Sequence, residues 1–217
     1  MWHNVTQNSE YPCECCGKTW MELREGRITG TSISSIMAHY GKEFGDPAEK
    51  LALDIAIVEL GGSSTPNNYK NSHMERGNTD EPIARKLYEN MFFCEVKNGG
   101  FFGKGRIGCS PDGLLYANGL IEIKSQQNSV HHKLLESGGY PSQYKWQLIH
   151  NLKVSEKDYI VFISYCSTYV PDKKIYTYEI FKDDVKTEFE QIDSRIEKFN
   201  KLIDFKKETI RRFQWQA

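Results

Sequence analysis

Residues 109–124 (CSPDGLLYANGLIEIK) constrain the fold of this chain more than any other segment. From residue 101 to 125, glycines interrupt short runs of strand-forming residues, and Asn118-Gly119 lies between two of these runs. An Asn-Gly pair between apolar runs is typical of a two-residue β-hairpin turn, because both residues readily adopt positive φ. We therefore expect a hairpin whose first arm carries Asp112 and whose second arm is LIEIK.

The second arm of this hairpin separates a polar face from an apolar one. Glu122 and Lys124 are two residues apart, so on a strand both side chains leave the same face. Ile121 and Ile123 leave the opposite face. The hairpin can therefore bring the carboxylates of Asp112 and Glu122 and the amine of Lys124 to one point.

These residue types suit the hydrolysis of a phosphodiester. That reaction needs hard oxygen ligands for Mg²⁺, a polarised water and positive charge near the phosphate. Asp112 and Glu122 can supply carboxylates, and the backbone carbonyl of Ile123 can complete the ion's inner shell. Lys124 can either help deprotonate the water or stabilise the charge that builds up, and the sequence leaves both roles open. An isolated Glu-x-Lys is more simply the wet face of an ordinary strand.

Several further motifs resemble the lambda-exonuclease-like, YqaJ-type viral recombinase family of the PD-(D/E)xK nucleases. They are Trp20-x3-Arg24-x-Gly26-x-Ile28-Thr29, Gly77 with Glu81, Cys109-Ser-Pro-Asp-Gly, Glu122-x-Lys124 and Tyr144-x2-Gln147. The likeness spans roughly residues 20–152. One departure is Thr31, followed by Ser32, where the family often has a serine, so a hydroxyl group is retained.

The resemblance implies an α/β fold with a PD-(D/E)xK core, in which helices flank a central mixed β-sheet. It also implies an active site and a pocket for the 5′-phosphate of a DNA end. Glu81 and Gln147 would join the core triad at the active site, and the pocket would consist of Arg24, Thr31 and Ser110. Taken alone, Glu81 in a first helical turn and Gln147 on an exposed helix face have purely structural explanations.

The resemblance further implies a Mg²⁺-dependent exonuclease that degrades linear double-stranded DNA from 5′ to 3′ and leaves 3′ overhangs for phage-type homologous recombination. Two ions are expected, with Mn²⁺ as a substitute. A homotrimeric ring and a single-strand annealing protein as partner are implied as well. Two other hypotheses stay open: a structure- or sequence-specific DNA endonuclease on the same core, and a non-catalytic zinc- or DNA-binding module.

Composition limits how such a protein can hold DNA. We expect the 217 residues to form a single nuclease domain over 1–217, with 1–19 as an N-terminal extension. The formal net charge of −1 provides no overall basic excess, so DNA must be held by a local groove. No apolar run approaches the roughly 18 residues of a membrane span, and the first residues do not combine a basic segment with a following apolar stretch, so we expect an unsecreted protein. We expect a cytoplasmic protein of a bacterium or a phage-infected cell, without membrane contact.

Helical periodicity predicts two helices before the hairpin. The first covers residues 46–62, is capped by Asp46 and buries Leu51, Ile55 and Val58. A loop is expected over 63–72. The second helix should begin near Thr79 or Asp80, with Pro82 early and with Ile83, Leu87 and Met91 on one face.

Four elements are expected after the hairpin. Residues 144–152 should be helical, and 159–166 and 174–181 should be strands. Apolar residues at steps of three and four predict a long amphipathic helix over about 183–205. We expect it to pack on the protein's own sheet rather than on a coiled-coil partner.

The six cysteines do not form the pattern of a disulfide-stapled secreted domain. Cys13, Cys15 and Cys16 are close enough to suggest zinc or an iron–sulfur cluster. We favour ordinary free thiols, because a fourth ligand would have to be His3 or one of the distant cysteines. His131 and His132 are adjacent and should point apart, towards solvent or DNA. Six basic residues are expected on a solvated surface, with phosphate contact as the second alternative, namely Lys104, Arg106, Lys206, Lys207, Arg211 and Arg212.

Overall fold

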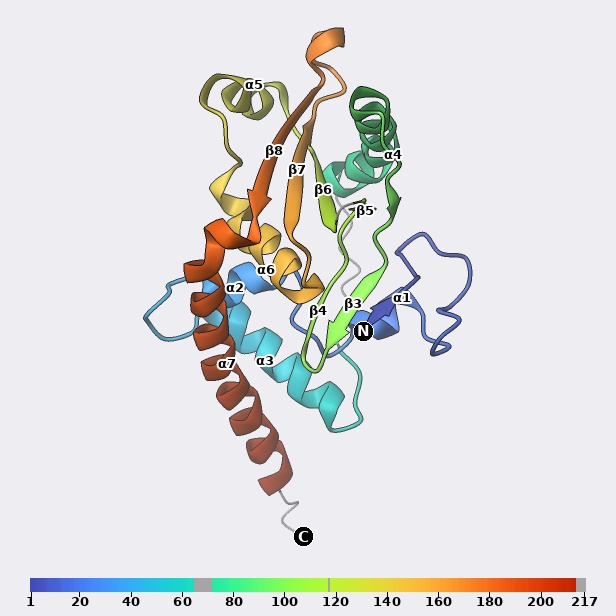
Figure 1. Ribbon diagram of the computed structural model, residues 1–217. Coiled ribbons are helices and arrows are strands. Elements are labelled where there is room, and N and C mark those ends of the chain that lie inside the picture. The colour runs from blue at the N-terminus through green and yellow to red at the C-terminus, as the bar shows by residue number, and fades with distance from the viewer. Residues whose placement is uncertain (65–71, 117, 214–217) are drawn as a thin grey trace.

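A five-stranded mixed β-sheet stands at the centre of the computed structural model, which describes residues 1–64, 72–116 and 118–213 (Figure 1). Its strand order is β2-β5-β6-β7-β8. The central pair β6–β7 is parallel, and the other neighbouring pairs are antiparallel. The strands are β2 (Lys97–Asn98), β5 (Gly113–Leu115), β6 (Gly119–Ser125), β7 (Tyr159–Tyr165) and β8 (Ile175–Phe181). The expected mixed sheet flanked by helices is confirmed.

A smaller antiparallel sheet, of order β1-β3-β4, joins the N-terminus to the strands that precede the hairpin. It comprises β1 (Trp2–His3), β3 (Phe101–Lys104) and β4 (Ile107–Cys109). Trp2 pairs with Phe102, and His3 pairs with Phe101. The first residues of the chain are therefore fixed beside the segment that leads to Asp112.

Helices cover both faces of the five-stranded sheet (Figure 1). The α-helices are α1 (Trp20–Arg24), α2 (Ile33–Met37), α3 (Asp46–Glu59), α4 (Ser72–Phe92), α5 (Asn128–Ser137), α6 (Lys145–Ser155) and α7 (Lys186–Arg212). Short 3-10 turns are η1 (Ser142–Tyr144), η2 (Pro171–Lys173) and η3 (Lys182–Val185). Within the described ranges, no helix has the length and apolar character needed to cross a membrane.

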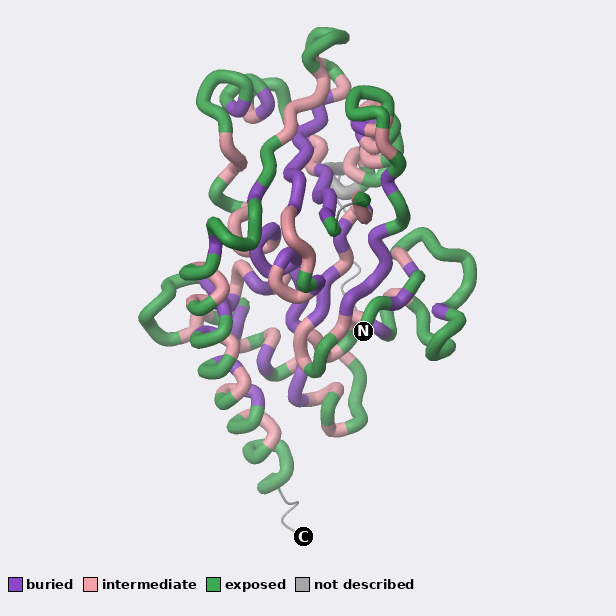
Figure 2. The backbone as a smooth tube through the Cα atoms, viewed as in Figure 1, coloured by how far each residue is buried: buried purple, intermediate pink, exposed green. Residues whose placement is uncertain are grey.

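The strand alternation predicted for the hairpin sorts its residues between two apolar clusters. Leu120 belongs to the larger cluster, which also takes in α2, α3, α6 and α7. Ile121 and Ile123 belong to the smaller cluster, where Ala84 and Tyr88 of α4 cover the other face. Figure 2 shows the resulting continuous burial along β6 and β7. The two faces of β6 are thus separated as expected.

The hairpin itself is confirmed, with one difference at its turn. Leu115 pairs with Gly119, so Gly119 is the first residue of β6 rather than the second residue of the turn. Asn118 adopts φ 68°, the left-handed conformation that its place in an Asn-Gly pair predicts.

Helix α3 forms where expected but buries a different face. Its N-cap is Gly45, so Asp46 lies in the first turn and is not the cap. Ile55 is buried as predicted, whereas Leu51 and Val58 are only half-buried. The buried face is otherwise made of Ala48, Ala52 and Ala56. Small side chains there allow α7 to pack closely on α3.

Helix α4 begins at Ser72, earlier than Thr79, and passes through Pro82. The predicted face is wrong at Ile83 and Met91, which are 46% and 51% exposed, whereas Leu87 packs against the smaller apolar cluster. The buried residues of this helix are Asp80, Ala84 and Tyr88, and the last two each follow a predicted position by one residue. Of the loop predicted over 63–72, residues 65–71 lie outside the described residues, and Ser72 is helical.

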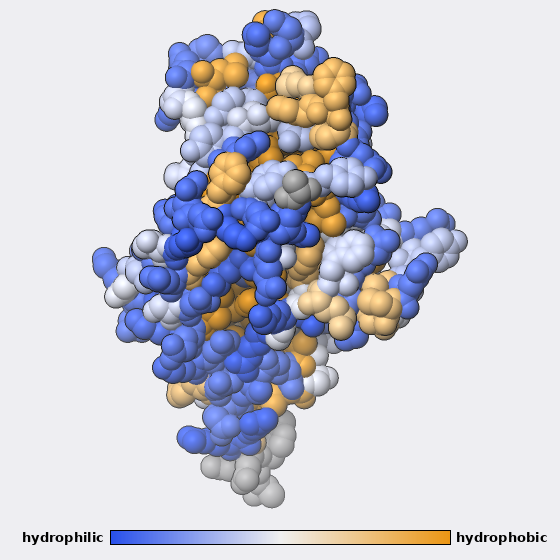
Figure 3. Space-filling view, in the orientation of Figure 1, coloured by the Kyte–Doolittle hydropathy of each residue, from blue (hydrophilic) through white to orange (hydrophobic). Residues whose placement is uncertain are grey.

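The helix, two strands and long helix predicted after the hairpin are present as α6, β7, β8 and α7, whereas α5 was not predicted. Helix α7 buries Ile192, Phe199 and Ile203. It packs mainly on α2, α3 and α6 rather than on the sheet, so the expectation of packing within the protein is right and the expected partner is wrong. Its outer surface is hydrophilic (Figure 3).

Two expectations about surface residues are also wrong. His131 is buried, within 2.7 Å of the Ser164 hydroxyl, because its face of α5 turns inward. Arg106 is not simply solvated, since it forms ion pairs with Glu59 and Asp204. Lys206 and Lys207 pair with Glu49 and Glu59.

Candidate active site

The hairpin opens at Asp112, and this opening exposes backbone groups of β6. The β5–β6 pairing extends no further than Gly113 with Ile121. Beyond that point the Asp112 side chain replaces a strand, because its Oδ2 accepts the Ile123 N–H at 2.6 Å. The N–H and C=O of one strand residue point the same way, so the Ile123 carbonyl also faces the side of Asp112.

Glu122 is held in place by three donors. Lys124 Nζ donates to Glu122 Oε1 at 2.8 Å, and Gln147 Nε2 donates to the same oxygen. Asn151 Nδ2 donates to Oε2 at 2.9 Å. Glu122 is only 2% exposed. The polar face predicted for Glu122 is therefore not open to solvent, because α6 covers it and supplies Gln147 and Asn151.

The electrostatics of the site favour a bound cation. Burial raises the pKa of Asp112 well above its usual value, and the negative charges of Glu122 and Glu81 add to this effect. Burial alone would lower the pKa of Lys124, but Glu122 and Asp112 outweigh it and raise that pKa. The carboxyl groups of Asp112, Glu122 and Glu81 thus lie near Lys124, and Arg85 pairs with Glu81.

Two cavities flank Asp112. The larger, of about 640 Å³, is lined by Asp112, Glu81, Ile123 and Lys124 together with Arg76 and neighbouring polar residues. The smaller, of about 280 Å³, shares Asp112 and Glu81 and adds Trp20, Arg85 and Ser110. Glu81 therefore faces the core triad, as predicted, although it also pairs with Arg85 at 3.0 Å.

The residues predicted to bind a terminal phosphate lie around Trp20. Arg24 Nη2 lies 3.3 Å from Thr31 Oγ1, and the guanidinium stacks 4.3 Å from the centre of the Trp20 ring. Trp20 Nε1 donates to Ser110 Oγ at 2.8 Å. Trp20 therefore links Arg24 and Thr31 to Ser110, and Ser110 opens onto the cavity of Asp112.

Asn151 is a site residue that the sequence motifs did not identify. Besides holding Glu122, it has a buried Oδ1 without a partner among the described residues. A Cβ at Gly30 would lie 2.3 Å from this oxygen, so Gly30 gives the amide its space. The signal was available, because Asn151 follows Gln147 by four residues and so shares its helix face.

A second group missed from sequence lies at the far end of β6. Ser125 Oγ donates to the buried carboxylate of Asp80. Arg76 Nε donates to Ser125 Oγ at 2.9 Å, and Arg76 also lines the larger cavity. These hydrogen bonds fix the positively charged guanidinium group of Arg76 on the wall of the larger cavity, near Lys124.

The donor set fits a hard divalent cation. Asp112 and Glu122 offer carboxylate oxygens, and the Ile123 carbonyl faces the same side. Oxygen donors of this kind are the ligands that Mg²⁺ prefers. The raised pKa of Asp112 reflects its burial first and the charges of Glu122 and Glu81 second, and a bound cation would offset both effects.

The chain was compared with solved structures and with curated proteins. An alkaline exonuclease, LHK-Exo from Laribacter hongkongensis, superimposes with a TM-score of 0.76 at 23% identity, over 89% of this chain and 95% of that chain. The structure of LHK-Exo in complex with dAMP superimposes with a TM-score of 0.73 at 22% identity, over 89% of this chain and 97% of that chain. A phage related exonuclease from Haemophilus somnus 129PT superimposes with a TM-score of 0.63 at 16% identity, over 84% of this chain and 96% of that chain. The comparison with curated proteins found no match.

At these identities the solved structures show the fold, and the expected PD-(D/E)xK architecture is confirmed. The family is shown by a different comparison. The family model described as YqaJ-like viral recombinase domain matches residues 19–158. Because this match covers well over half of the chain, the protein belongs to the YqaJ-like viral recombinase domain family.

Proposed function

We propose that this protein is a Mg²⁺-dependent exonuclease that degrades linear double-stranded DNA from 5′ to 3′ and leaves 3′ overhangs for phage-type homologous recombination. The observation that carries the proposal is the convergence of Asp112, Glu122 and Lys124 where the hairpin opens. Family membership and the fold shared with solved exonucleases support it.

The residues of the site have distinct roles in this proposal. Asp112, Glu122 and the Ile123 carbonyl would hold Mg²⁺, as one or two ions and with Mn²⁺ as a substitute, and the metal would supply Lewis-acid charge and a polarised water. Gln147 and Asn151 keep the Glu122 carboxylate oriented. Lys124, whose amine donates to Glu122, would either help deprotonate the attacking water or stabilise the developing negative charge.

The DNA end would be recognised beside the metal site. Arg24 presents a planar fork of donors, and Thr31 and Ser110 add hydroxyls without adding charge. A terminal 5′-phosphate held there would place the first phosphodiester near Asp112. This arrangement supports digestion from the 5′ end.

A comparison of linear and covalently closed circular DNA of one sequence tests the proposal. With Mg²⁺, the linear duplex should lose nucleotides, its 5′-terminal label first, while the circle stays intact. Cutting of the circle would instead identify an endonuclease, and no release from either form would identify a non-catalytic module. Ca²⁺ should support binding but not cleavage, because it coordinates more ligands at longer distances than Mg²⁺.

We also propose that the protein assembles as a homotrimeric ring in the cytoplasm and works with a single-strand annealing protein. The likeness to the YqaJ-type recombinases supports these proposals. The recombination role would require the partner to load on the 3′ overhang as it forms. Co-purification of the two proteins from a cell that expresses both would test the partnership.

A further inference from the structure

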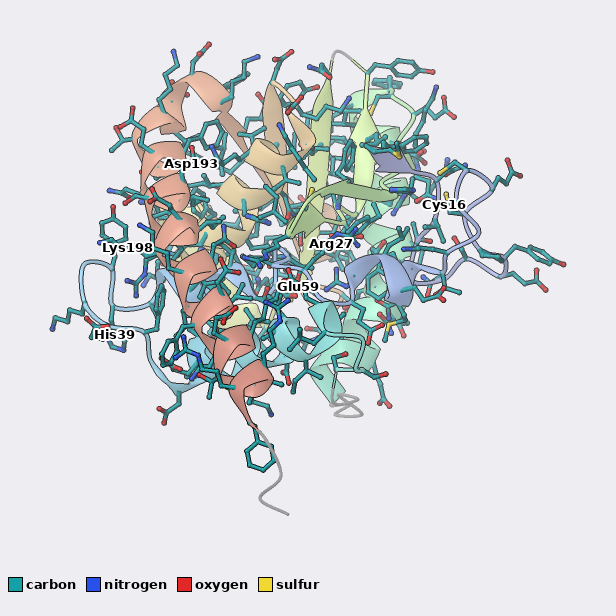
Figure 4. The ribbon with its side chains drawn as sticks, turned by 90° about the horizontal axis from the view of Figure 1, so that it is seen from below. Cys16, Arg27, His39, Glu59, Asp193 and Lys198 are labelled. Atoms are coloured by element: carbon teal, nitrogen blue, oxygen red, sulfur yellow. The ribbon has the colours of Figure 1, made fainter. Side chains whose placement is uncertain are left out.

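Four side chains of the N-terminal segment meet outside the acidic site. His3 Nδ1 lies 3.2 Å from Cys15 Sγ, 3.5 Å from Cys16 Sγ and 3.7 Å from Cys13 Sγ. All four ligand atoms lie within 4.8 Å of one another. We call these four residues the N-terminal cluster. Figure 4 shows Cys16 on the N-terminal loop, on the opposite side of the molecule from α7.

The spacing within the cluster matches ligands around a single ion. Zinc bonds of about 2.3 Å to sulfur and 2.1 Å to nitrogen place tetrahedral ligands about 3.6 Å apart for nitrogen and sulfur, and about 3.8 Å apart for two sulfurs. The three observed nitrogen–sulfur distances bracket the first value. The Cys13 and Cys15 sulfurs are 3.0 Å apart, which is well beyond a disulfide bond of about 2.05 Å but shorter than the separation of two zinc-bound sulfurs, so these two thiolates would move apart when the ion binds.

The local backbone explains how closely spaced cysteines converge. The Gly17 N–H donates to the Cys13 carbonyl at 2.7 Å, and Gly17 adopts φ 67°, which closes a tight turn around Cys15 and Cys16. His3 reaches the turn from β1, whose pairing with Phe101 fixes it. Cys13 and Cys16 are also separated by two residues, which is a zinc-type spacing that the intervening Cys15 obscured.

We propose that His3, Cys13, Cys15 and Cys16 bind one Zn²⁺ ion, in place of the ordinary thiols expected from the sequence. Three cysteines and one histidine form a closed structural set with no position left for a reacting group. Binding releases three thiol protons to solvent and leaves the complex with a charge of −1. Lys18, Arg27 and the N-terminal amino group lie near His3 and offset this charge.

An ion at this cluster would fasten one wall of the active-site cavities. His3 and Cys13 bracket a loop that contains Thr6, Gln7 and Asn8. These three residues line the smaller cavity beside Asp112, and Gln7 also lines the larger one. The zinc would thus close the base of this loop against β3 without taking part in hydrolysis.

The geometry distinguishes zinc from an iron–sulfur cluster. Such a cluster spreads its thiolates over several iron atoms, which separates the ligands more widely than one ion does. Four of the six ligand pairs are 3.0–3.7 Å apart and all six lie within 4.8 Å, which leaves room for one ion only. Metal analysis of purified protein separates the two cases directly.

The test measures metal content in the full chain purified under reducing conditions. We expect about one zinc per chain, a Co²⁺-substituted form with the visible absorption of tetrahedral thiolate coordination, and near-complete loss of both in Cys16→Ser and His3→Ala. Cys94→Ser is the matched control, because Cys94 is half-buried and lies outside the cluster. It should retain full zinc content.

Three results would overturn the proposal: stoichiometric iron, a Cys13–Cys15 disulfide in freshly purified protein, or reduced protein that takes up no metal after dialysis against Zn²⁺. Hydrogen exchange tests the fastening role separately. Amides of residues 1–18 should lose protection in Cys16→Ser while those of β7 keep theirs, and unchanged protection would refute that role. Neither measurement uses DNA, so both stand apart from the nuclease proposal.

Discussion

At the scale of single residues, Asp112 is destabilising in the absence of a cation. Burial and the nearby Glu122 raise the pKa of Asp112 in the folded state, so ionisation of this carboxyl group lowers the free energy of unfolding. The cost is absent below the unfolded pKa of about 3.9 and grows as pH rises towards the folded pKa. A group arranged in this way suits metal binding better than structural support.

Asp112→Asn should therefore abolish hydrolysis and yet raise the melting temperature of metal-free protein at pH 7. The gain should shrink as pH falls towards 4, where the wild-type carboxyl is protonated as well. Each kcal/mol corresponds to about 2–4 °C at this chain length. Asp172→Asn, at an exposed carboxylate, is the control and should change neither property. A destabilised, active Asp112→Asn would refute the assignment.

Glu122 should behave in the opposite way on stability. Its carboxylate satisfies donors from Lys124, Gln147 and Asn151. Glu122→Ala leaves those donors without their acceptor, so we expect loss of activity together with a loss of about 1–3 kcal/mol in urea unfolding. Glu179→Ala, on an exposed position of β8, should cost little. Equal stability of the two variants would show that the Glu122 contacts do not hold the site.

Arg24 should set the preference for the chemistry of the DNA end. Linear duplexes with a 5′-phosphate should be degraded faster than 5′-hydroxyl duplexes, by about ten- to a hundredfold if a contact of roughly 1.5–3 kcal/mol is expressed in the transition state. Arg24→Ala should shrink this ratio and leave hydroxyl substrates little affected, whereas Arg211→Ala should not change it. Equal rates on both substrates in the wild type would contradict the pocket around Trp20.

The core of the site was predictable because strand alternation and a hairpin signal sufficed to bring Asp112, Glu122 and Lys124 together. Burial of Glu122 was not predictable, since nothing in Glu-x-Lys shows that α6 covers that face. The zinc site proposed at Cys13 and Cys16 was not predicted for a different reason. Its fourth ligand would be His3, and only the pairing of β1 with β3 brings that residue to the turn.

At the scale of elements, a cluster of charges joins α7 to α3 and to the β3–β4 turn. Arg106 makes a bidentate pair with Glu59, and Lys207 reaches Glu59 at 2.6 Å. Hydrogen bonds from Arg106 and then Lys207 lower the pKa of Glu59 to about 2. Glu59 lies at the end of α3, beside α7 (Figure 4).

Glu59→Gln should destabilise the protein by about 1–2 kcal/mol at pH 7, a value reduced from the full pKa shift because the pair is partly solvated. A lowered pKa contributes stability above the unfolded value near 4.3, and this contribution disappears as pH falls towards 2. The two urea curves should therefore converge in acid. Glu197→Gln removes a fully exposed pair with Lys201 and should have almost no effect. A pH-independent difference would refute the charge explanation.

The sequence predicted which segments form helices better than it predicted which face of each helix is buried. The periodicity of α4 is ambiguous because Ile83, Leu87 and Met91 repeat at the same step as Ala84 and Tyr88. The more hydrophobic residues are those of the first group, Ile83, Leu87 and Met91. In the structure, Ala84 and Tyr88 face the sheet instead, because the small alanine allows α4 to approach β6 closely. Likewise, α3 buries alanines because α7 lies against it, and no local signal in α3 reveals that neighbour.

At the scale of the whole molecule, the net charge of −1 limits how long a single subunit can stay on DNA. Non-specific affinity comes largely from phosphate neutralisation, and here the cations beside the site are few and partly paired with acids. An isolated subunit should then dissociate between cuts. Enclosure of the duplex by the proposed ring would retain it without requiring a strongly basic surface.

We therefore expect a solution mass of about 75 kDa by light scattering, three times the 25.1 kDa chain. Digestion of a long linear duplex, once started, should continue after excess heparin is added, because an enclosed duplex cannot exchange with a competitor until its end is reached. Heparin added before the enzyme should block the reaction, which controls for trap efficiency. A 25 kDa species whose digestion stops when heparin is added would refute the ring, while leaving the chemistry of Asp112, Glu122 and Lys124 untouched.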